Sequence, residues 1–390
     1  MAKELIQTNK IYFKNLDSIR FFAALMVFLG HGMSESYKYL NIKDSFIEKF
    51  IYAISNGGIG VSIFFVLSGF LITYLILSEI ELTDKFSLKN FYVRRILRIW
   101  PLYFVVVIIA FLIFPTLSIL LKSPINRGAN IWYQLTFLSN FDILNIEKNR
   151  PGTELLMQNI TWSVAIEEQF YAFWPLIFAF LPRKFILPAI ITSIIGSLVF
   201  RYYHSNDTIT LYFHTLSVVV DLGIGAIFAY AIISYSKVRK FFQQTNTGII
   251  FVSYILFFYS IICGDLLFST SSSFLFRLYL DILFAFIIAS QSMIIKPSIL
   301  ELGNIKFANK WGKYTYGIYL LHPIALEIIH IVEKQFHLRF DSFLPLFISG
   351  VCGFILTLII SWVSYEYFEK KFLLLKKAFT FLYRNKNMLT

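Results

Sequence analysis

The sequence predicts an all-α, polytopic integral membrane protein with about ten transmembrane helices and with both termini in the cytoplasm. Its 390 residues are 57% hydrophobic and only 15% charged, whereas about a quarter of the residues are charged in soluble domains. A water-soluble fold of this size could not bury so much apolar surface in one core. Apolar segments recur along the chain, and each is long enough to cross the roughly 30 Å of hydrocarbon in a bilayer.

The expected spans follow one another with short connections. They occupy about 17–35, 57–80, 99–121, 161–182, 185–203, 212–235, 247–267, 274–295, 312–333 and 342–368. The segment 130–144 is too short to span, so we expect it to lie at the membrane interface or to re-enter. We predict one transmembrane domain over 1–378, a short basic cytoplasmic tail over 379–390, and no cleaved signal peptide.

The distribution of basic residues predicts the orientation. With the N-terminus inside, 24 of the 35 Lys and Arg residues fall on cytoplasmic segments, as the positive-inside rule requires. The net charge of +12 therefore indicates membrane topology rather than binding to nucleic acid. The longest loop, about 122–160, then faces outward and contains a turn signal at 150–153. Neither of the two cysteines belongs to a disulfide framework or a metal-binding pattern.

Asp17, Arg20 and His31 are ionisable residues of the first span, and such residues are expensive in lipid and therefore indicate a functional site. Asp17 and Arg20 are three residues apart and can pair on one helix face. Arg20 and His31 share a face and lie about 16 Å apart along the axis, so His31 lies deep in the bundle. Alternatively, Arg20 extends to lipid headgroups and His31 bonds a backbone carbonyl.

Basic residues also precede the third span. Arg95 and Arg98 lie on one helix face, and guanidinium groups bind phosphate oxygens in a bidentate manner. These arginines also fit ordinary flanking by basic residues on the cytoplasmic side.

The fourth span begins with Trp162 and Ser163 and continues to the adjacent acids Glu167 and Glu168. Adjacent residues of a helix point about 100° apart, so at most one of these acids faces the centre of a pocket. Acids near a helix start are also favoured by the helix dipole.

Two later spans contain polar residues at unusual depth. Asp221 lies in the middle of the sixth span, and the ninth span contains Tyr319 and His322 three residues apart. Tyrosines at such positions can also belong to an interfacial aromatic belt. The glycines near 57–60 and at Gly69 are better explained by close helix packing than by phosphate binding.

Together these segments resemble the membrane-bound acyltransferase 3 family, whose members include bacterial O-antigen and other cell-surface sugar O-acetyltransferases. The matches run in the family's order over about 17–325, and Ser18 stands where the family often has Gly. They are Arg20 with His31, the segment 60–72, Arg95 with Arg98, the segment 162–171 and the segment 317–323. Some relatives carry an extra helix and an esterase-like domain after the bundle, and we expect neither here.

The resemblance implies a ten-helix bundle with His31 as the catalytic residue and with Arg95 and Arg98 binding the CoA of a cytoplasmic acyl-CoA donor. The acceptor would enter at the outer half of the membrane. We expect Arg20 and Asp17 to support His31, and Glu167 to shape the site. Trp162, Ser163, Tyr319 and His322 are the predicted substrate-binding residues.

Elementary chemistry agrees with this hypothesis. A histidine titrates near neutral pH and can remove the proton from a sugar hydroxyl, and a thioester has a good leaving group, so no metal is required. The predicted reaction is acyl transfer, most simply of acetyl, to a cell-surface or lipid-linked sugar at the bacterial inner membrane. A covalent acyl-histidine intermediate is an alternative route, and a sugar exporter without chemistry is the alternative function. The sequence specifies neither the acceptor nor the oligomeric state.

Overall fold

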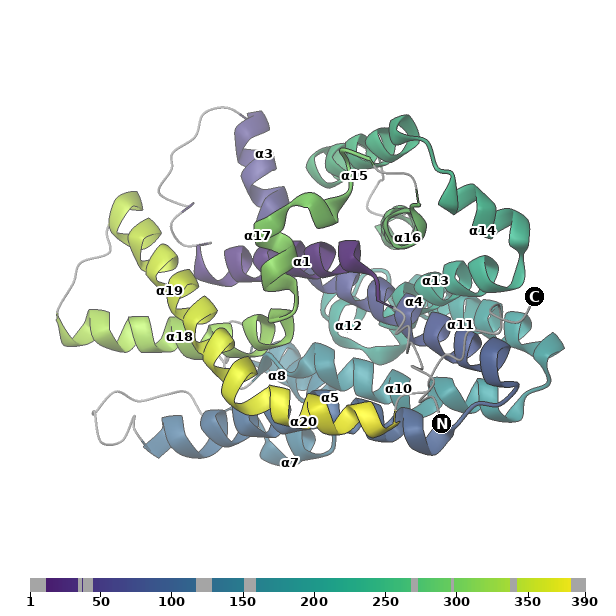
Figure 1. Ribbon diagram of the computed structural model, residues 1–390. Coiled ribbons are helices and arrows are strands. Elements are labelled where there is room, and N and C mark those ends of the chain that lie inside the picture. The colour runs from purple at the N-terminus through teal and green to yellow at the C-terminus, as the bar shows by residue number, and fades with distance from the viewer. Residues whose placement is uncertain are drawn as a thin grey trace, which may run out of the picture.

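The computed structural model describes residues 12–33, 37, 45–116, 128–150, 159–267, 273–295, 298–336 and 342–379. Within these ranges the regular elements are all helical (Figure 1). The first half of the chain contains α1 (Lys14–Gly32), α3 (Ser45–Ile54), α4 (Gly57–Thr83), α5 (Leu88–Ile108), its π-helical continuation (Ile109–Ile113), α7 (Ile131–Leu135), α8 (Ser139–Asn149) and α10 (Trp162–Phe180).

The second half continues the same pattern of long and short helices. It contains α11 (Arg183–Tyr203), α12 (Thr208–Phe213), α13 (Thr215–Ser234), α14 (Ser236–Gln243), α15 (Thr247–Leu267), α16 (Ser273–Met293), α17 (Lys306–Gly312), α18 (Thr315–Gln335), α19 (Phe343–Ser364), a π-helical turn (Tyr365–Glu369) and α20 (Lys370–Leu375). The prediction of an all-α protein is confirmed for the described residues.

Local sequence explains where several helices begin and end. The Asn56 side chain accepts a hydrogen bond from the backbone N–H of Ile59 and caps α4, and the Ser87 side chain caps α5 in the same way. After α4 the chain turns at Asp84 in a left-handed conformation with φ of 56°, which Asp tolerates better than most residues. The side chains of Asn56 and Ser87 thus satisfy N–H groups that the start of a helix leaves without partners.

Glycines allow α4 and α13 to pack closely. A Cβ atom at Gly69 would overlap the carbonyl oxygen of Leu222, and one at Gly225 would overlap that of Val66. Small residues let helix backbones approach each other in membrane proteins. The prediction that Gly69 serves helix packing is therefore confirmed.

In the part of the chain that the structure describes, seven helices are long and apolar enough to cross a membrane, and the count is eight if the bent pair of α14 and α15 is one span. All ten predicted spans coincide with long helices, but α1 and α10, each of 19 residues, are not among these candidates. Their polar side chains, including Asp17, Arg20, Glu167 and Glu168, lower their hydropathy. The count of ten and the orientation of the termini remain predictions.

The segment 130–144 forms two short helices, α7 and α8, neither of which is long enough to span a bilayer. This agrees with the expected interfacial or re-entrant segment. The predicted turn at 150–153, apart from Arg150, and the predicted tail at 379–390, apart from Phe379, lie outside the described residues.

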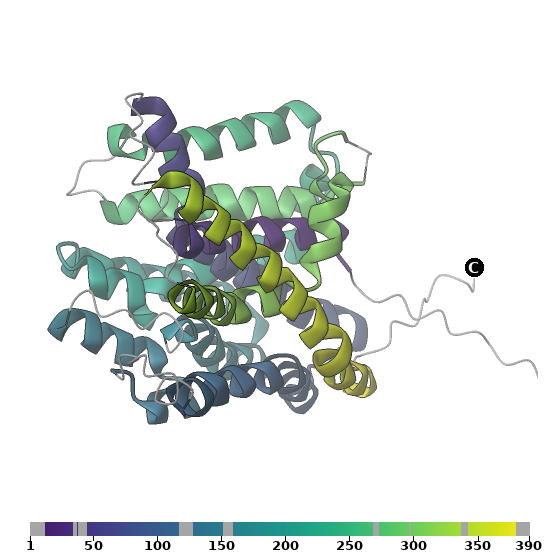
Figure 2. The ribbon, with the colours of Figure 1, turned by 90° about the vertical axis from the view of Figure 1, so that its left-hand side faces the viewer.

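Helix α1 occupies the middle of the molecule (Figure 1) and contacts α4, α16, α17, α18 and α19. Figure 2 shows α19 crossing the molecule obliquely beside α18. We call the end of α1 near Arg20 the arginine end of the bundle and the end near His31 the histidine end.

Candidate active site

Two histidines from distant parts of the chain meet inside the bundle. Nδ1 of His31 in α1 lies 3.0 Å from Nε2 of His322 in α18, and the two ring planes are within 8° of parallel. His322 is buried, whereas His31 is exposed where it borders a cavity. His31 thus lies in the last turn of α1 and borders the cavity, rather than deep in the bundle as predicted, and its partner on another helix is buried.

The hydrogen bonds of this pair determine the tautomer of each neutral ring. Nδ1 of His322 lies 3.2 Å from the carbonyl oxygen of Ile318, and a carbonyl only accepts, so Nδ1 of His322 carries the proton. Nε2 of His322 then has a lone pair and accepts from Nδ1–H of His31. The remaining nitrogen of His31, Nε2, is consequently unprotonated and can act as a base.

A cavity of about 230 Å³ opens beside His31 at the histidine end. Its wall combines aromatic, aliphatic and a few polar side chains, as in many small-molecule sites. The lining residues are Val27, His31, Gly57, Val61, Ile143, Glu147, Asn159, Ile160, Trp162, Tyr212, Phe213 and Tyr319.

The four predicted substrate-binding residues divide into two layers. Trp162 and Tyr319 line the cavity, whereas Ser163 and His322 lie behind the wall. The Ser163 hydroxyl is 2.5 Å from that of Tyr319, so it holds the tyrosine in place, as His322 holds His31. Substrate binding by all four remains a prediction.

Three lining residues with polar side-chain groups were not expected from the sequence: Glu147 from α8, Asn159 before α10, and Tyr212 from α12. The first two belong to the segment interpreted as an outer loop, and Tyr212 was placed at the start of the sixth span. The Asp207 side chain caps α12 by accepting from the N–H of Thr210. An N-capping Asp directly before the short segment 208–213 was the available signal for a separate short helix.

The other predicted residues of α1 lie toward the arginine end. Nη1 of Arg20 donates to the carboxylate of Asp17 over 2.5 Å, so the predicted pairing of these residues is confirmed. The second oxygen of Asp17 accepts a hydrogen bond from the Tyr12 hydroxyl over 2.6 Å. Arg20 also lies within electrostatic range of Arg98 in α5, which connects the first span with the predicted CoA-binding arginines.

The three arginines before the third span have different surroundings. Arg94 pairs with the carboxylate of Glu79 over 2.9 Å and donates to the carbonyl oxygen of Phe379 over 2.7 Å. Among the described residues, Arg95 and Arg98 form no hydrogen bond or ion pair. The guanidinium of Arg95 instead lies over the ring of Tyr171, 5.5 Å from its centroid. Arg95 and Arg98 are therefore the members of the triplet with free donors.

The two adjacent acids of α10 contact different helices, which agrees with the angle of about 100° between adjacent residues of a helix. Glu167 accepts a hydrogen bond from Ser68 of α4 over 2.5 Å, and Glu168 accepts one from the indole of Trp100 of α5 over 2.8 Å. Neither lines the cavity beside His31. Glu167 therefore lies between that cavity and the arginines as part of the packing of α4 against α10.

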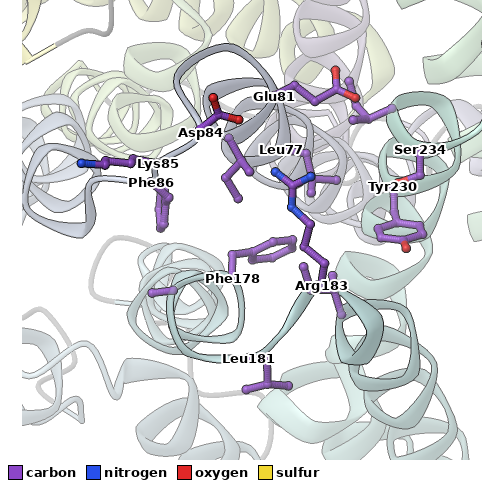
Figure 3. A pocket seen from close by; sticks show the side chains of 14 residues that line it. Leu77, Glu81, Asp84, Lys85, Phe86, Phe178, Leu181, Arg183, Tyr230 and Ser234 are labelled. Atoms are coloured by element: carbon purple, nitrogen blue, oxygen red, sulfur yellow. The ribbon is translucent and has the colours of Figure 1, made fainter.

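A second cavity, of about 340 Å³, is lined by residues from α4, α10, α11 and α13 and from the turn before α5. Figure 3 shows Glu81, Asp84 and Lys85 around it, with Phe178 and Arg183 extending into it. None of the predicted site residues lines this cavity. Its mixture of acidic and basic side chains indicates no particular ligand.

Charged residues also meet between α11, α13 and α16. Asp221 accepts hydrogen bonds from Arg277, one of them over 2.9 Å. Arg201 donates to the hydroxyl of Ser217 over 2.6 Å. The carboxyl of Asp281 is fully buried without a hydrogen-bond partner, within electrostatic range of both arginines. This group has two acids and two bases and does not line either cavity.

No cluster of three or more His, Cys, Asp or Glu side chains capable of holding a metal ion occurs in the described part of the chain. At the histidine end, the unprotonated Nε2 of His31 lies beside a small cavity. Toward the arginine end, Arg95 and Arg98 have free guanidinium donors. This arrangement can activate a hydroxyl group and can bind an anionic group.

Comparison with known proteins connects this arrangement with a reaction class. The chain is 29% identical over 339 residues to a protein of Staphylococcus aureus strain COL that carries an O-acetyltransferase name, covering 82% of this chain and 53% of that protein. It is 34% identical over 234 residues to O-acetyltransferase OatA of S. aureus strain NCTC 8325, covering 56% of this chain and 34% of OatA.

The chain thus spans about half the length, or less, of these curated relatives. No solved structure matches it. Residues 13–366 match the acyltransferase domain of the acyltransferase 3 family. This match includes His31, His322, the arginine triplet and α10, and the chain therefore belongs to the acyltransferase 3 family.

Proposed function

We propose that the protein transfers an acetyl group from acetyl-CoA to a hydroxyl of a cell-surface or lipid-linked sugar in the bacterial inner membrane. The observation that carries the proposal is the pair of His31 and His322 at the wall of a small cavity. Membership of the acyltransferase 3 family and the O-acetyltransferase relatives support the reaction class.

In the proposed reaction, Nε2 of His31 takes the proton of the sugar hydroxyl as the oxygen attacks the thioester carbonyl carbon. The new C–O bond forms and the C–S bond breaks, and the CoA thiolate leaves. The proton on His31 passes to the thiolate, so that the products are the acetylated sugar and CoA–SH. Nδ1–H of His31 remains bonded to His322 over 3.0 Å, which stabilises the protonated ring as it forms.

Arg95 and Arg98 bind the phosphates of the donor in this proposal. Both have guanidinium groups without protein acceptors among the described residues, and phosphate oxygens suit the bidentate geometry of these groups. Arg20, which the Asp17 carboxylate holds over 2.5 Å, extends the positive region toward His31. The pantetheine arm would lie between the arginine end and His31.

The orientation that we propose puts the arginine end in the cytoplasm, where acyl-CoA is made. The support is the excess of Lys and Arg on the segments at that side. The acceptor then approaches from the outer face, at the histidine end.

The alternative function, export of a sugar without chemistry, explains neither the deprotonated Nε2 of His31 nor membership of an acyltransferase family. A transporter would also use the polar cavity, so consumption of the donor is what separates the two functions.

Replacement of His31 is the direct test. We expect His31→Ala and His31→Gln in detergent-purified protein to lower acetyl transfer about 10²- to 10⁴-fold, the usual contribution of a general base. His330→Ala is the matched control, because its side chain is 54% exposed on α18. Near-normal transfer by a well-folded His31→Ala protein, with acetyl-CoA consumption and thermal unfolding both measured, would contradict the proposal.

A further inference from the structure

The cavity beside His31 contains polar groups that the hydrogen bonds of the protein do not use. Asn159 is 5% exposed, and its side-chain amide forms no hydrogen bond with the described residues. Leaving a buried amide unpaired is unfavourable, so a buried polar group of this kind requires a partner. Because Asn159 lines the cavity, a ligand in the cavity can supply that partner.

Glu147 supplies the charge of the cavity wall. It is half-buried and forms no hydrogen bond or ion pair with the described residues. No Lys or Arg from the described part of the chain lines the cavity. The neighbouring ammonium of Lys148 is 2.6 Å from the carboxylate of Asp207. Burial alone would raise the pKa of Asp207, but hydrogen bonds from Lys148 and Thr210 lower it to about 2, so Asp207 stays ionised and offsets this cation.

The remaining wall is aromatic. The rings of Trp162 and Tyr212 are 5.0 Å apart, and those of Trp162 and Phe213 are 4.9 Å apart. Apolar surfaces of this kind cover the C–H face of a sugar ring, while a few polar groups orient its hydroxyls. The volume of about 230 Å³ is below the roughly 300–1,000 Å³ of sites for drug-sized ligands, so one sugar ring fits rather than several.

We infer that this cavity is the acceptor site and that it selects a single uncharged or amine-bearing sugar residue over an anionic one. Asn159 bonds a hydroxyl of the bound ring, and the carboxylate of Glu147 bonds another hydroxyl or a protonated amine. The carboxylate of Glu147 repels the carboxylate of a uronate bound in the same place, because no cation of the described wall balances the charge of Glu147. This inference rests on the proposed function, since it assigns the acceptor of the His31 reaction.

The test uses the full chain with acetyl-CoA and three probes: the p-nitrophenyl β-glycosides of glucose, glucosamine and glucuronic acid. We expect the first two to be acetylated with kcat/KM at least tenfold above that of the glucuronide. Glu147→Gln should raise kcat/KM for the glucuronide about tenfold and lower that for the glucosaminide several-fold, because the protonated amine loses its carboxylate partner. Asn159→Ala should raise the KM for the glucoside several-fold while the KM for acetyl-CoA stays the same.

Asn145→Ala is the matched control for the acceptor variants, because Asn145 is an exposed residue of α8 that does not line the cavity. Equal or preferred use of the glucuronide, or unchanged kinetics in both Glu147→Gln and Asn159→Ala, would overturn the inference and leave the proposed function intact. No transfer to any probe by protein that still consumes acetyl-CoA through His31 would also overturn the inference alone. Complete failure to consume acetyl-CoA would overturn the proposed function and this inference together.

Discussion

Arginines gather in two regions of the helix bundle, and their surroundings differ. Between α11, α13 and α16, Arg277 and Arg201 have carboxylate, hydroxyl or carbonyl acceptors, and two acids balance the two bases. On α5, Arg95 and Arg98 have no such acceptors among the described residues, whereas Arg94 beside them is paired with Glu79. The paired arginines thus have their anions within the fold, whereas Arg95 and Arg98 have free donors that the phosphates of the proposed donor would occupy.

The largest effect should come from breaking the paired region. Arg277→Ala leaves Asp221 without its hydrogen-bonded cation, and removal of one partner from a buried ion pair costs about 3–5 kcal/mol. We expect the midpoint of thermal unfolding in detergent to fall strongly, while kcat per folded molecule stays near that of the wild type.

Neutralising both partners provides the control for this prediction. The double variant Asp221→Asn with Arg277→Gln should recover most of the lost stability, because it neutralises both members of the pair and leaves Arg201 to balance Asp281. If Arg277→Ala instead removes donor binding from a protein of normal stability, the paired region belongs to the active site and the comparison fails.

An intermediate effect should follow from replacing His322, which we regard as a positioning residue. His322→Ala removes the acceptor for Nδ1–H of His31, so either ring nitrogen can then carry the proton. We expect kcat to fall about 10²-fold, within the usual range for acid–base groups, with little change in the KM for acetyl-CoA.

His322→Gln distinguishes positioning from packing, because its amide oxygen can reach toward His31 and accept the same hydrogen bond. We expect this variant to recover part of kcat and to retain the wild-type pH profile, whereas His322→Ala should shift that profile. Equal losses in the two variants without any shift would indicate that His322 only fills space.

The smallest effect should come from conservative changes within the arginine triplet. Arg95→Lys and Arg98→Lys keep the charge but lose the bidentate geometry, so the KM for acetyl-CoA should rise about tenfold, equivalent to ~1.4 kcal/mol. Arg94→Lys should leave this KM unchanged and lower thermal stability, because Arg94 binds Glu79 and the carbonyl of Phe379. The same rise in KM at all three positions would indicate a diffuse basic surface.

Much of the fold could be predicted because hydrophobic length and local pairing are encoded over short stretches. The helices, the bond between Asp17 and Arg20, and the close packing at Gly69 all follow from local pattern. The partner of His31 did not follow in the same way. His31 and His322 are 291 residues apart in sequence, so only the packing of α1 against α18 brings them together.

The cavity wall was harder to predict than the histidines. Glu147 and Asn159 belong to a polar segment that has no membrane-spanning pattern, and such a segment resembles an ordinary loop. The different roles within the arginine triplet also required the structure, because Arg94 turns only about 40° away from Arg98 on an ideal helix. Arg94 differs from Arg95 and Arg98 because Glu79 on α4 lies close enough to pair with Arg94.

The low hydropathy of α1 has a consequence for biosynthesis. Ionisable residues lower the affinity of an inserting helix for lipid, and α1 carries both Asp17 and Arg20 near its start. Helix α1 therefore depends on other helices of the bundle for part of its stability in the membrane. It packs along α4 through Gly60, so the residues that we propose to support catalysis make membrane insertion of α1 a cooperative event.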